Sequence, residues 1–510
     1  MKKYLFTCLL TFAGFFPTVF AATPDTVVVA GKQYDRGFFH RLFWGTHYRK
    51  VWAEPVRVPF LDLNTHAGGL KPTEKGGSFQ TKNLRLLNPD GREYVIRSVD
   101  KDASQTLSPE KRKSIIGKVI RDQTSVVHPY GAMIVPPLAA AAGVFHANPQ
   151  FFVVPSDPVL GEFQQEFANM LVMVEERPEG NWENNPDFGN SKEVVSSKKA
   201  FTQLVKENNN RVDAHAFLRA RLFDMFLGDW SRREDQWRWA TYKLPNGGTY
   251  YKPIPRDRDH AFFKFNDGVI TWLASLYARN MQTFGPNIKN LKGLNRTAQP
   301  LDRSLLLYLT KAEFRQIGDS LKIALTDAVI ENAVRQWPEN IYKITGKEFE
   351  KNLKKRRDQL PKVAERYYHI LAKEVEMPGS DESEIFRLTG AKKSLLVEML
   401  KPGKKGKPDT LLYSRTYYPN ETKSLKIYGL GEEDTFEFLG EGNPLRKLEI
   451  YDGEDEDEII YKSKKNKRID ILDSGDGNKI SETKKLKVKL YQPKANEFDG
   501  KGWLLRHRLN

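Results

Sequence analysis

The fold of this chain is decided by residues 228–237, GDWSRREDQW, and by residues 255–262, PRDRDHAF. The segment between them, residues 239–252, alternates like a β-hairpin and turns at Asn-Gly-Gly. Two acidic clusters at the ends of neighbouring elements are a common way to build a site for a metal ion and phosphate, because hard cations prefer carboxylate oxygens. The pattern therefore predicts a metal–phosphate site in a mixed α+β fold.

The pattern of the chain divides it into lobes and modules. With 510 residues it is too long for one compact core. Residues 76–180 carry strand patterns, and residues 181–376 are mainly helical. A polar linker separates them from short alternating strands in residues 384–510. We therefore predict a two-lobed domain, preceded by an extension over residues 23–75 and followed by an all-β, sandwich-like module.

Local signals predict several individual elements. Residues 83–87 and 93–99 have the pattern of two strands, joined by the turn sequence Asn88-Pro89-Asp90-Gly91. Another apolar strand is expected at residues 170–174, and a helix at residues 212–227.

Two threonines have the spacing of a helix-capping box. They are Thr310, with Glu313, and Thr345, with Glu348. In such a box the threonine oxygen and the glutamate carboxylate each accept a backbone N–H at the start of a helix. A long helix is expected to begin after each threonine.

The N-terminus has the pattern of an export signal. Lys2 and Lys3 precede an apolar run, and small residues end it at Ala21 and Ala22. We expect residues 1–22 to be removed and the mature protein to lie in the periplasm, at the cell surface or outside the cell. The single cysteine lies within this signal, so no disulfide is expected. No later stretch has the length and apolarity of a membrane-spanning helix.

The charge of the chain favours acidic partners. Its formal net charge of +16 suits a nucleotide, another phosphate-bearing small molecule, or an acidic glycan. The expected export makes nucleic acid a poor partner. The sequence contains no Gly-x-Ser-x-Gly elbow and no Walker-type phosphate loop, so neither a serine hydrolase nor a P-loop enzyme is indicated.

Several short motifs resemble atypical kinases. Residues 76–82, GGSFQTK, and the strand ending at residues 94–97, YVIR, resemble the N-lobe of HipA-like kinases. Residues 226–233 resemble the catalytic loop of secretory-pathway casein kinases and lipid kinases, and residues 257–262 are similar to the Asp-x-Asp metal motif of CotH-type spore-coat kinases. The resemblance covers residues 70–375 and implies a two-lobed kinase-like fold that binds ATP with Mg²⁺ or Mn²⁺.

The resemblance also implies which residues hold the phosphates. Arg97 stands at the position of the nucleotide-binding lysine, and its guanidinium fork suits phosphate oxygens. Lys101 is a second candidate close behind it. Lys82 ends the glycine-containing segment and is a third.

The metal and the acceptor are assigned by the same resemblance. Asp257 and Asp259 correspond to the metal-binding carboxylates, and Gln236 falls where the family has an asparagine that assists them. Asp229 is the candidate to orient the acceptor hydroxyl.

Two departures from the family pattern leave the function open. Ser231 stands where the catalytic aspartate is expected, and Arg233 replaces a histidine. The base is therefore missing or displaced to Asp229. The possible functions are an active phosphotransferase, an inactive envelope scaffold that binds a glycan or protein partner, and a metal-dependent phosphoesterase. A structural interpretation also remains open, in which the charges of residues 229–235 form a salt-bridge cluster after a buried helix.

Acidic segments recur in the C-terminal module. They begin at Gly431, Asp452 and Asp473, with a spacing of 21 residues each time. They faintly resemble the Gly/Asp turns of calcium-binding β-rolls, but differ in length and glycine content. We interpret them as acidic hairpin turns in a sandwich-like module and leave calcium binding open.

Overall fold

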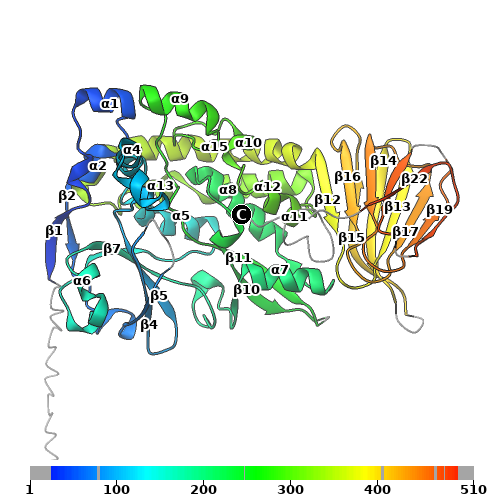
Figure 1. Cartoon of the computed structure of the whole chain (residues 1–510), viewed down its shortest axis with the longest axis horizontal. Helices are drawn as coiled ribbons and strands as arrows, with labels where there is room; N and C mark the ends of the chain where they lie inside the picture. The colour runs from blue at the N-terminus through cyan, green and yellow to red at the C-terminus, as the bar shows by residue number, and fades with distance from the viewer. Residues whose placement is uncertain are drawn as a thin grey trace, which may run out of the picture.

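The computed structural model describes residues 24–76, 81–245, 247–403, 407–464, 468–475 and 477–491. A β-rich lobe, a helical section and a two-sheet module follow one another along the long axis of the molecule (Figure 1). The export signal and part of the glycine-containing segment at residues 76–82 lie outside the described residues. No helix in the described part of the chain has the length and apolar character needed to span a bilayer.

The N-terminal lobe is built on an antiparallel sheet with the strand order β3-β4-β5-β7-β6. Its strands are β3 (Lys71–Lys75), β4 (Asn83–Leu87), β5 (Glu93–Ser98), β6 (Gln150–Val153) and β7 (Leu171–Glu176). The three strands expected in this lobe are therefore confirmed. In the turn between β4 and β5, Gly91 has a φ of +75°, and the Asn88 carboxamide oxygen accepts the N–H of Arg92 at 2.8 Å.

The N-terminal extension packs beside this lobe. It consists of the paired strands β1 (Asp25–Val29) and β2 (Pro55–Pro59) and the helices α1 (Phe38–Trp44) and α2 (Arg49–Ala53). The buried Arg49 ties it to the lobe through an ion pair of 2.6 Å with Asp122. Short helices also connect the strands of the lobe: α3 (Pro109–Lys113), α4 (Ile115–Asp122), α5 (Val135–Ala142) and α6 (Gln164–Phe167). Two of these helices, α3 and α4, meet at Ser114.

The helical section surrounds one buried helix, α8 (Ala214–Leu227), against which α12 and α15 pack. Its other helices are α7 (Ser197–Lys206), α9 (Val269–Tyr277), α10 (Leu291–Leu294), α11 (Gln299–Leu305), α12 (Lys311–Ala324), α13 (Asp327–Val334), α14 (Glu339–Ile341) and α15 (Lys347–Ala372). A small sheet of order β8-β10-β11-β9 lies below them, with β8 (Val194–Ser196), β9 (Arg211–Val212), β10 (Trp237–Lys243) and β11 (Thr249–Pro255). The predicted hairpin is the β10–β11 pair.

One of the two capping boxes forms. Thr310 caps α12, because its hydroxyl accepts the N–H of Glu313 while the Glu313 carboxylate accepts the N–H of Thr310 at 2.6 Å. The capping box predicted at Thr345 does not form, because that residue lies in a π-helical turn, Tyr342–Gly346, which continues directly into α15. The long helix expected after Thr345 is present as α15.

The C-terminal module consists of two sheets packed face to face, which confirms the expected sandwich-like layering (Figure 1). One sheet contains β12 (Glu374–Pro378), β16 (Ser424–Tyr428), β18 (Lys447–Tyr451), β20 (Ile469–Asp473) and β22 (Leu486–Leu490). The other contains β13 (Ile385–Ala391), β14 (Ser394–Lys401), β15 (Thr410–Tyr417), β17 (Thr435–Gly440), β19 (Glu458–Tyr461) and β21 (Lys479–Ile480). The module thus includes β12, which precedes most of the polar linker.

From β16 onward the chain is a parallel coil. Successive strands alternate between the two sheets, and each strand pairs in parallel with the strand two places further along the chain. Leu425 lies opposite Leu448, for example, and Ile459 opposite Ile480. The interpretation of the acidic segments as hairpin turns is therefore wrong: each one carries the chain from the first sheet to the second, so the strands that flank it do not pair with each other.

The acidic corners of this coil are stacked. The backbone N–H of Asp434 donates to Oδ1 of Asp457 at 2.8 Å, and the N–H of Asp457 donates to Oδ1 of Asn478 at 2.7 Å. The N–H of Glu384 donates in the same way to Asp434, at 2.7 Å. We call Asp434, Asp457 and Asn478 the corner ladder, because the side-chain oxygen of each residue accepts a backbone N–H from the preceding corner.

The ladder contains two buried carboxyl groups that lack a full set of partners. Within the described chain, Oδ2 of Asp434 and Oδ2 of Asp457 have no hydrogen-bond partner. Burial raises the pKa of Asp457 to about 8 and that of Asp434 well above its usual range. Asn478 differs, because its amide donates to Asp452 and Asp473 at 2.9 and 2.8 Å.

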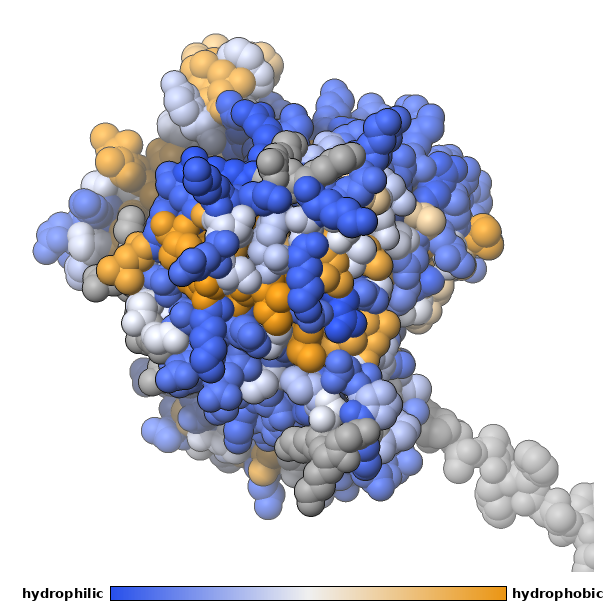
Figure 2. Space-filling model, turned by 90° about the vertical axis from the view of Figure 1, so that its right-hand side faces the viewer, coloured by the Kyte–Doolittle hydropathy of each residue, from blue (hydrophilic) through white to orange (hydrophobic). Residues whose placement is uncertain are grey.

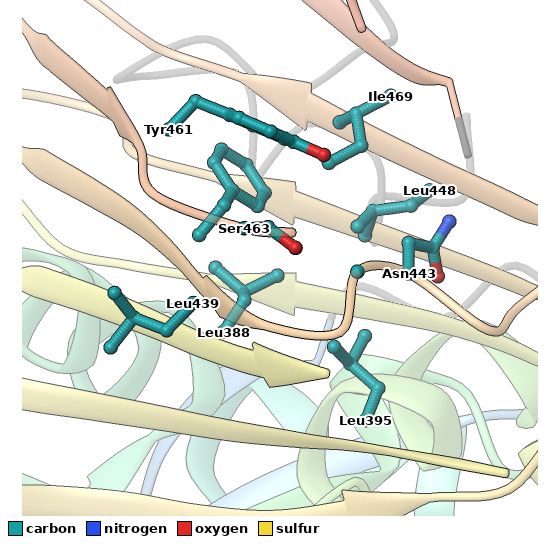
Figure 3. A pocket seen from close by; sticks show the side chains of 10 residues that line it. Leu388, Leu395, Leu439, Asn443, Leu448, Tyr461, Ser463 and Ile469 are labelled. Carbon is teal, nitrogen blue, oxygen red and sulfur yellow. The ribbon is translucent and has the colours of Figure 1, made fainter. Parts of the chain in front are cut away.

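The interior of the coil contains a small cavity of about 10 Å³, shown in Figure 3. Leucine side chains surround it together with Asn443, Tyr461 and Ser463, so it has room for about one water molecule with polar partners. Among the described residues, β22 and β21 are the last strands of the two sheets. In the view onto this end, hydrophobic residues form a band across a mostly hydrophilic face (Figure 2), and Leu490 of β22 is largely exposed.

Candidate functional site

Arg97 lies where the β-rich lobe meets the helical section. It is the second-last residue of β5, and its position in the sheet is fixed by pairing with Asn83 on β4 and Met173 on β7. Its guanidinium lies 3.0 Å from the carboxylate of Glu175 on β7 and forms an ion pair with Asp257. Only 7% of Arg97 is exposed. The guanidinium therefore links the sheet to the segment that follows β11.

Asp257 and Asp259 reach the β-rich lobe from that segment. β11 ends at Pro255, and Asp257 has a φ of +51°, a left-handed conformation that aspartate tolerates better than most residues. Asp259 forms an ion pair with Lys101. The Asp257 and Asp259 side chains remain 25% and 29% exposed, so a ligand can reach both carboxylates.

Burial and ion pairing act against each other in this cluster. Burial raises the pKa of Glu175 to about 7, although Arg97 lowers it. Burial lowers the pKa of Arg97, but Asp257 and Glu175 outweigh that effect and raise it above its ordinary value. Burial raises the pKa of Asp259, but the positive charges of Lys101 and Arg97 have the larger effect. The pKa of Asp259 is therefore well below its usual range. The cluster is a set of mutually dependent charges.

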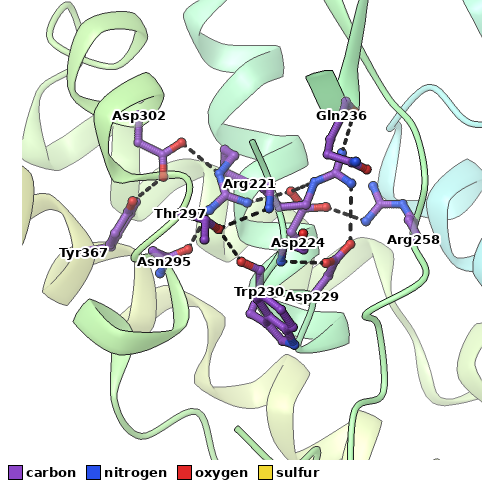
Figure 4. Close-up of polar contacts among 12 residues, drawn as sticks. Arg221, Asp224, Asp229, Trp230, Gln236, Arg258, Asn295, Thr297, Asp302 and Tyr367 are labelled. Carbon is purple, nitrogen blue, oxygen red and sulfur yellow. Dashed lines mark hydrogen bonds and ion pairs between the residues drawn. The ribbon is translucent and has the colours of Figure 1, made fainter. Parts of the chain in front are cut away.

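Asp229 belongs to a separate, buried network (Figure 4). It is 1% exposed, and its carboxylate accepts the N–H of Ser231 at 3.1 Å and lies 3.5 Å from Arg232. Burial raises the pKa of Asp229 to about 6. Ser231 is also buried. Asp229 therefore has no open face toward an acceptor in this conformation.

Arg232 connects this network to the cluster around Arg97. Its guanidinium donates to the backbone oxygens of Arg256, at 2.5 Å, and Gln236, at 3.1 Å, and lies 3.2 Å from Asp224. It also lies over the ring of Trp237, 4.8 Å from the ring centroid. Because Arg256 immediately precedes Asp257, Arg232 fixes the backbone from which the metal-site candidates project.

The centre of the network is Asp224, which the sequence did not single out. It lies on α8 and pairs with Arg221 at 2.6 Å, with Arg232 and with Arg258. Arg221 extends the network to Asp302 at 2.8 Å, and the Tyr367 hydroxyl donates to the same carboxylate. The sequence signal for this network is an Arg and an Asp three residues apart on a helix whose other residues, except His215 and Arg219, are apolar.

The other residues that the sequence suggests, Lys82 and Gln236, make no side-chain hydrogen bond or ion pair with Asp257 or Asp259 in the described part of the chain. Lys82 is exposed, and its backbone pairs with Ser98 beside Arg97. The side-chain amide of Gln236 donates to Asp235 at 3.3 Å, and its backbone oxygen accepts the N–H of Arg256 at 2.9 Å. Arg233 forms a solvent-exposed pair with Asp235 at 2.8 Å. Thus Arg97, Lys101, Asp257 and Asp259 lie together as the candidate site, whereas Asp229 belongs to the buried network.

The site fits a divalent cation only together with a ligand. Among the described residues, no group of three or more His, Cys, Asp or Glu side chains is arranged to hold a metal ion. Two carboxylates with phosphate oxygens are a usual coordination set for Mg²⁺, which keeps several waters and rarely uses an all-protein cage. A cation at Asp257 and Asp259 would therefore need phosphate or water to complete its shell.

The comparisons with known proteins identify no family. No family model matches the chain, and no curated protein matches it significantly. Among solved structures, one similar chain is described as amicoumacin kinase hAmiN in complex with AMP-PNP, Ca²⁺ and Ami. It is 11% identical, the match covers 57% of this chain and 88% of that one, and the TM-score is 0.16. A likeness at this level supports no statement about activity.

Proposed function

We propose that this protein binds a phosphate-bearing ligand together with a divalent cation between Arg97 and Lys101 on one side and Asp257 and Asp259 on the other, without transferring the phosphoryl group. Two ion pairs carry the proposal: Arg97–Asp257 and Lys101–Asp259. Each joins a cation at the end of β5 or shortly after it to a carboxylate that follows the β10–β11 hairpin. Both charge types needed for a metal–phosphate site thus face each other.

Ligand binding would exchange the partners of these pairs. Phosphate oxygens would pair with Arg97 and Lys101, which releases the carboxylates of Asp257 and Asp259 to bind Mg²⁺ or Mn²⁺. No charge is left uncompensated in either state, so the exchange avoids the cost of an unpaired charge in a partly buried site. Asp257 and Asp259 would hold the metal, which would supply positive charge next to the phosphate.

The position of Asp229 supports the absence of phosphoryl transfer. A group that orients or deprotonates an acceptor must come within hydrogen-bond reach of it. Asp229 is enclosed by Ser231 and Arg232, and Ser231, at the expected aspartate position, is itself buried. These contacts support a structural role for Asp229 and favour the inactive alternative. Export from the cytoplasm, which the N-terminal sequence predicts, also agrees with binding rather than ATP-dependent catalysis.

Calorimetric titration tests the proposal. ATP and inorganic pyrophosphate are titrated into the protein with Mg²⁺, with Mn²⁺ and with chelator. We expect the parent protein to bind only when the metal is present. Asp257→Asn should bind more weakly and without dependence on the metal, and Arg97→Gln should not bind. Arg57→Gln, which removes an exposed pair with Asp25, is the matched control and should bind like the parent. Absence of heat with either ligand at millimolar concentration, in folded protein, would refute the proposal.

A further inference from the structure

The exposed apolar residues of the described chain are concentrated on two short helices. None of the residues of α1 is buried, and on α9 only Thr271 is buried. The large apolar residues exposed on these helices are Phe38, Phe39, Leu42, Phe43, Val269, Ile270, Trp272, Leu273, Leu276 and Tyr277. We call this surface the apolar tip. A soluble protein rarely leaves so many large apolar side chains together in water.

The two helices form one unit. They lie side by side at the end of the molecule opposite the C-terminal module (Figure 1). Their backbones meet at two glycines: a Cβ on Gly268 would lie 2.2 Å from the backbone nitrogen of Gly45, so no larger residue fits there. The N–H of His47 also donates to Asp267 at 2.7 Å. The tip is therefore held in place by the residues just after α1 and just before α9.

The segment that contains and follows α9 carries only basic charges, although Asp267 precedes it. From Gly268 to Pro300 the sequence contains no acidic residue, but it contains Arg279, Lys289, Lys292 and Arg296. All four are exposed. On the other side, Asp35 is paired with Arg41 at 2.6 Å, so it adds no net negative charge. Arg41 lies on α1 and Arg279 two residues after α9, so basic residues border the apolar surface. Such a surface matches a layer of anionic lipid headgroups over acyl chains.

The residue types support the same partner. Trp272 and Tyr277, both more than half exposed, are amphipathic rings of the kind that concentrate at membrane–water interfaces. Phe and Leu make up most of the rest, and the apolar faces of α1 and α9 present few groups for directional hydrogen bonds. A protein partner would normally need such groups for specificity.

We propose that the apolar tip docks the protein on an anionic membrane surface, with α1 and α9 lying in the headgroup region and their basic border on the lipid phosphates. This docking does not depend on the proposed ligand site, because the tip lies outside the Arg97 cluster. It also differs from a membrane span, since both helices are far too short to cross a bilayer.

Vesicle flotation of the full-length protein, as purified, tests the docking. We expect it to float with vesicles of phosphatidylglycerol and phosphatidylethanolamine, to float much less with phosphatidylcholine alone, and to be released by salt. Phe39→Glu and Leu273→Glu should each reduce partitioning roughly tenfold or more, because each removes an apolar side chain from the lipid. Ile323→Glu is the matched control: Ile323 is exposed on α12, outside the tip, and should leave flotation unchanged.

The N-terminal apolar run of the sequence is common to every variant, so any lipid binding that it causes is the same in all of them. Two outcomes would overturn the proposal. In one, the parent fails to float, or Phe39→Glu and Leu273→Glu float as it does. In the other, analytical ultracentrifugation shows a dimer that only these two variants lose, without any vesicle binding, which would assign the tip to contact between copies. Because these residues are exposed, normal melting of the variants is expected.

Discussion

Arg97 and Asp257 form an ion pair across the junction between the antiparallel sheet and the segment that follows β11. The guanidinium also faces Glu175, so one cation serves two carboxylates, one from each side of the junction. The site and the contact between the two parts of the molecule therefore depend on the same side chain.

Replacing Arg97 with alanine should destabilise the protein. Glu175 and Asp257 would lose their shared cation, and breaking a largely buried ion pair by removing one partner costs about 3–5 kcal/mol. Urea denaturation measures this change in the free energy of unfolding. The comparison variant Arg57→Ala should show no measurable change, because its pair with Asp25 is exposed. Equal stability of Arg97→Ala and the parent would contradict the role we give to the pair.

Two aspartates in the buried network should differ sharply in their effect on stability. Asp224 faces Arg221, Arg232 and Arg258, so Asp224→Asn should cost about 3–5 kcal/mol by leaving three arginines short of a counter-charge. Asp229→Asn should cost about 1 kcal/mol or less, because the amide oxygen can still accept the N–H of Ser231. Thermal or urea unfolding of the two variants gives the comparison. A larger loss for Asp229→Asn would mean that the centre of the network is misassigned.

Restoring the expected aspartate at position 231 should not restore a kinase. Ser231 is buried beside Asp229, so Ser231→Asp adds a second carboxylate to a closed space and should destabilise the protein by about 2 kcal/mol or more. We expect no transfer of radiolabelled phosphate from ATP to the protein or to casein. Ser108→Asp, at the exposed N-cap of α3, should be tolerated. Phosphotransfer gained by Ser231→Asp would show instead that the protein is a disabled kinase.

The corner ladder should make stability depend on pH. The pKa of Asp457 rises from 3.8 in the unfolded chain to about 8 in the folded protein, so the folded state binds the proton more tightly. Protonation therefore favours folding, and the contribution of Asp457 to stability should fall as pH rises from about 4 through about 8. Asp457→Asn should reduce this slope, to which Asp434 still contributes, and stabilise the protein at neutral pH by about 1–3 kcal/mol.

Asn478 provides the reverse experiment. Asn478→Asp puts a carboxylate where an amide now donates to Asp452 and Asp473, so it should lower stability at pH 8 more than at pH 5. Glu454→Gln, at an exposed position of the same corner, should leave the slope unchanged. Denaturation curves across this pH range measure all three. If calcium stabilises the parent and Asp457→Asn abolishes that effect, the unpaired oxygens bind a cation rather than a proton.

Local structure was predictable because its causes are local. The Asn88–Gly91 turn, the strands on either side of it and the cap at Thr310 depend on residues within a few positions of each other. The same reasoning failed at Thr345, where the helix continues through a π turn. The sequence assigns Arg97 and Asp257, 160 residues apart, to one site but does not predict their ion pair. The burial of Asp229 depends on packing between distant segments, which short motifs do not encode.

The C-terminal module shows a different limit. Its strands were recognisable by alternation, but their partners were not, because each strand pairs with one in the next coil rather than with its neighbour in sequence. The recurring 21-residue spacing of the acidic segments was the available signal for this connectivity. The pairing of β18 with β20 has that spacing, since Ile450 lies opposite Ile471.

The parallel coil also constrains how this part of the chain can change in length. Each coil contacts mainly the coil before and the coil after it, so stability is approximately a sum over coils. Insertion of one residue within a strand would turn every later side chain to the wrong face. Gain or loss of a complete coil would instead preserve both sheets and the corner ladder. Related chains should therefore differ in this module by multiples of about twenty residues, with shorter changes confined to the corners.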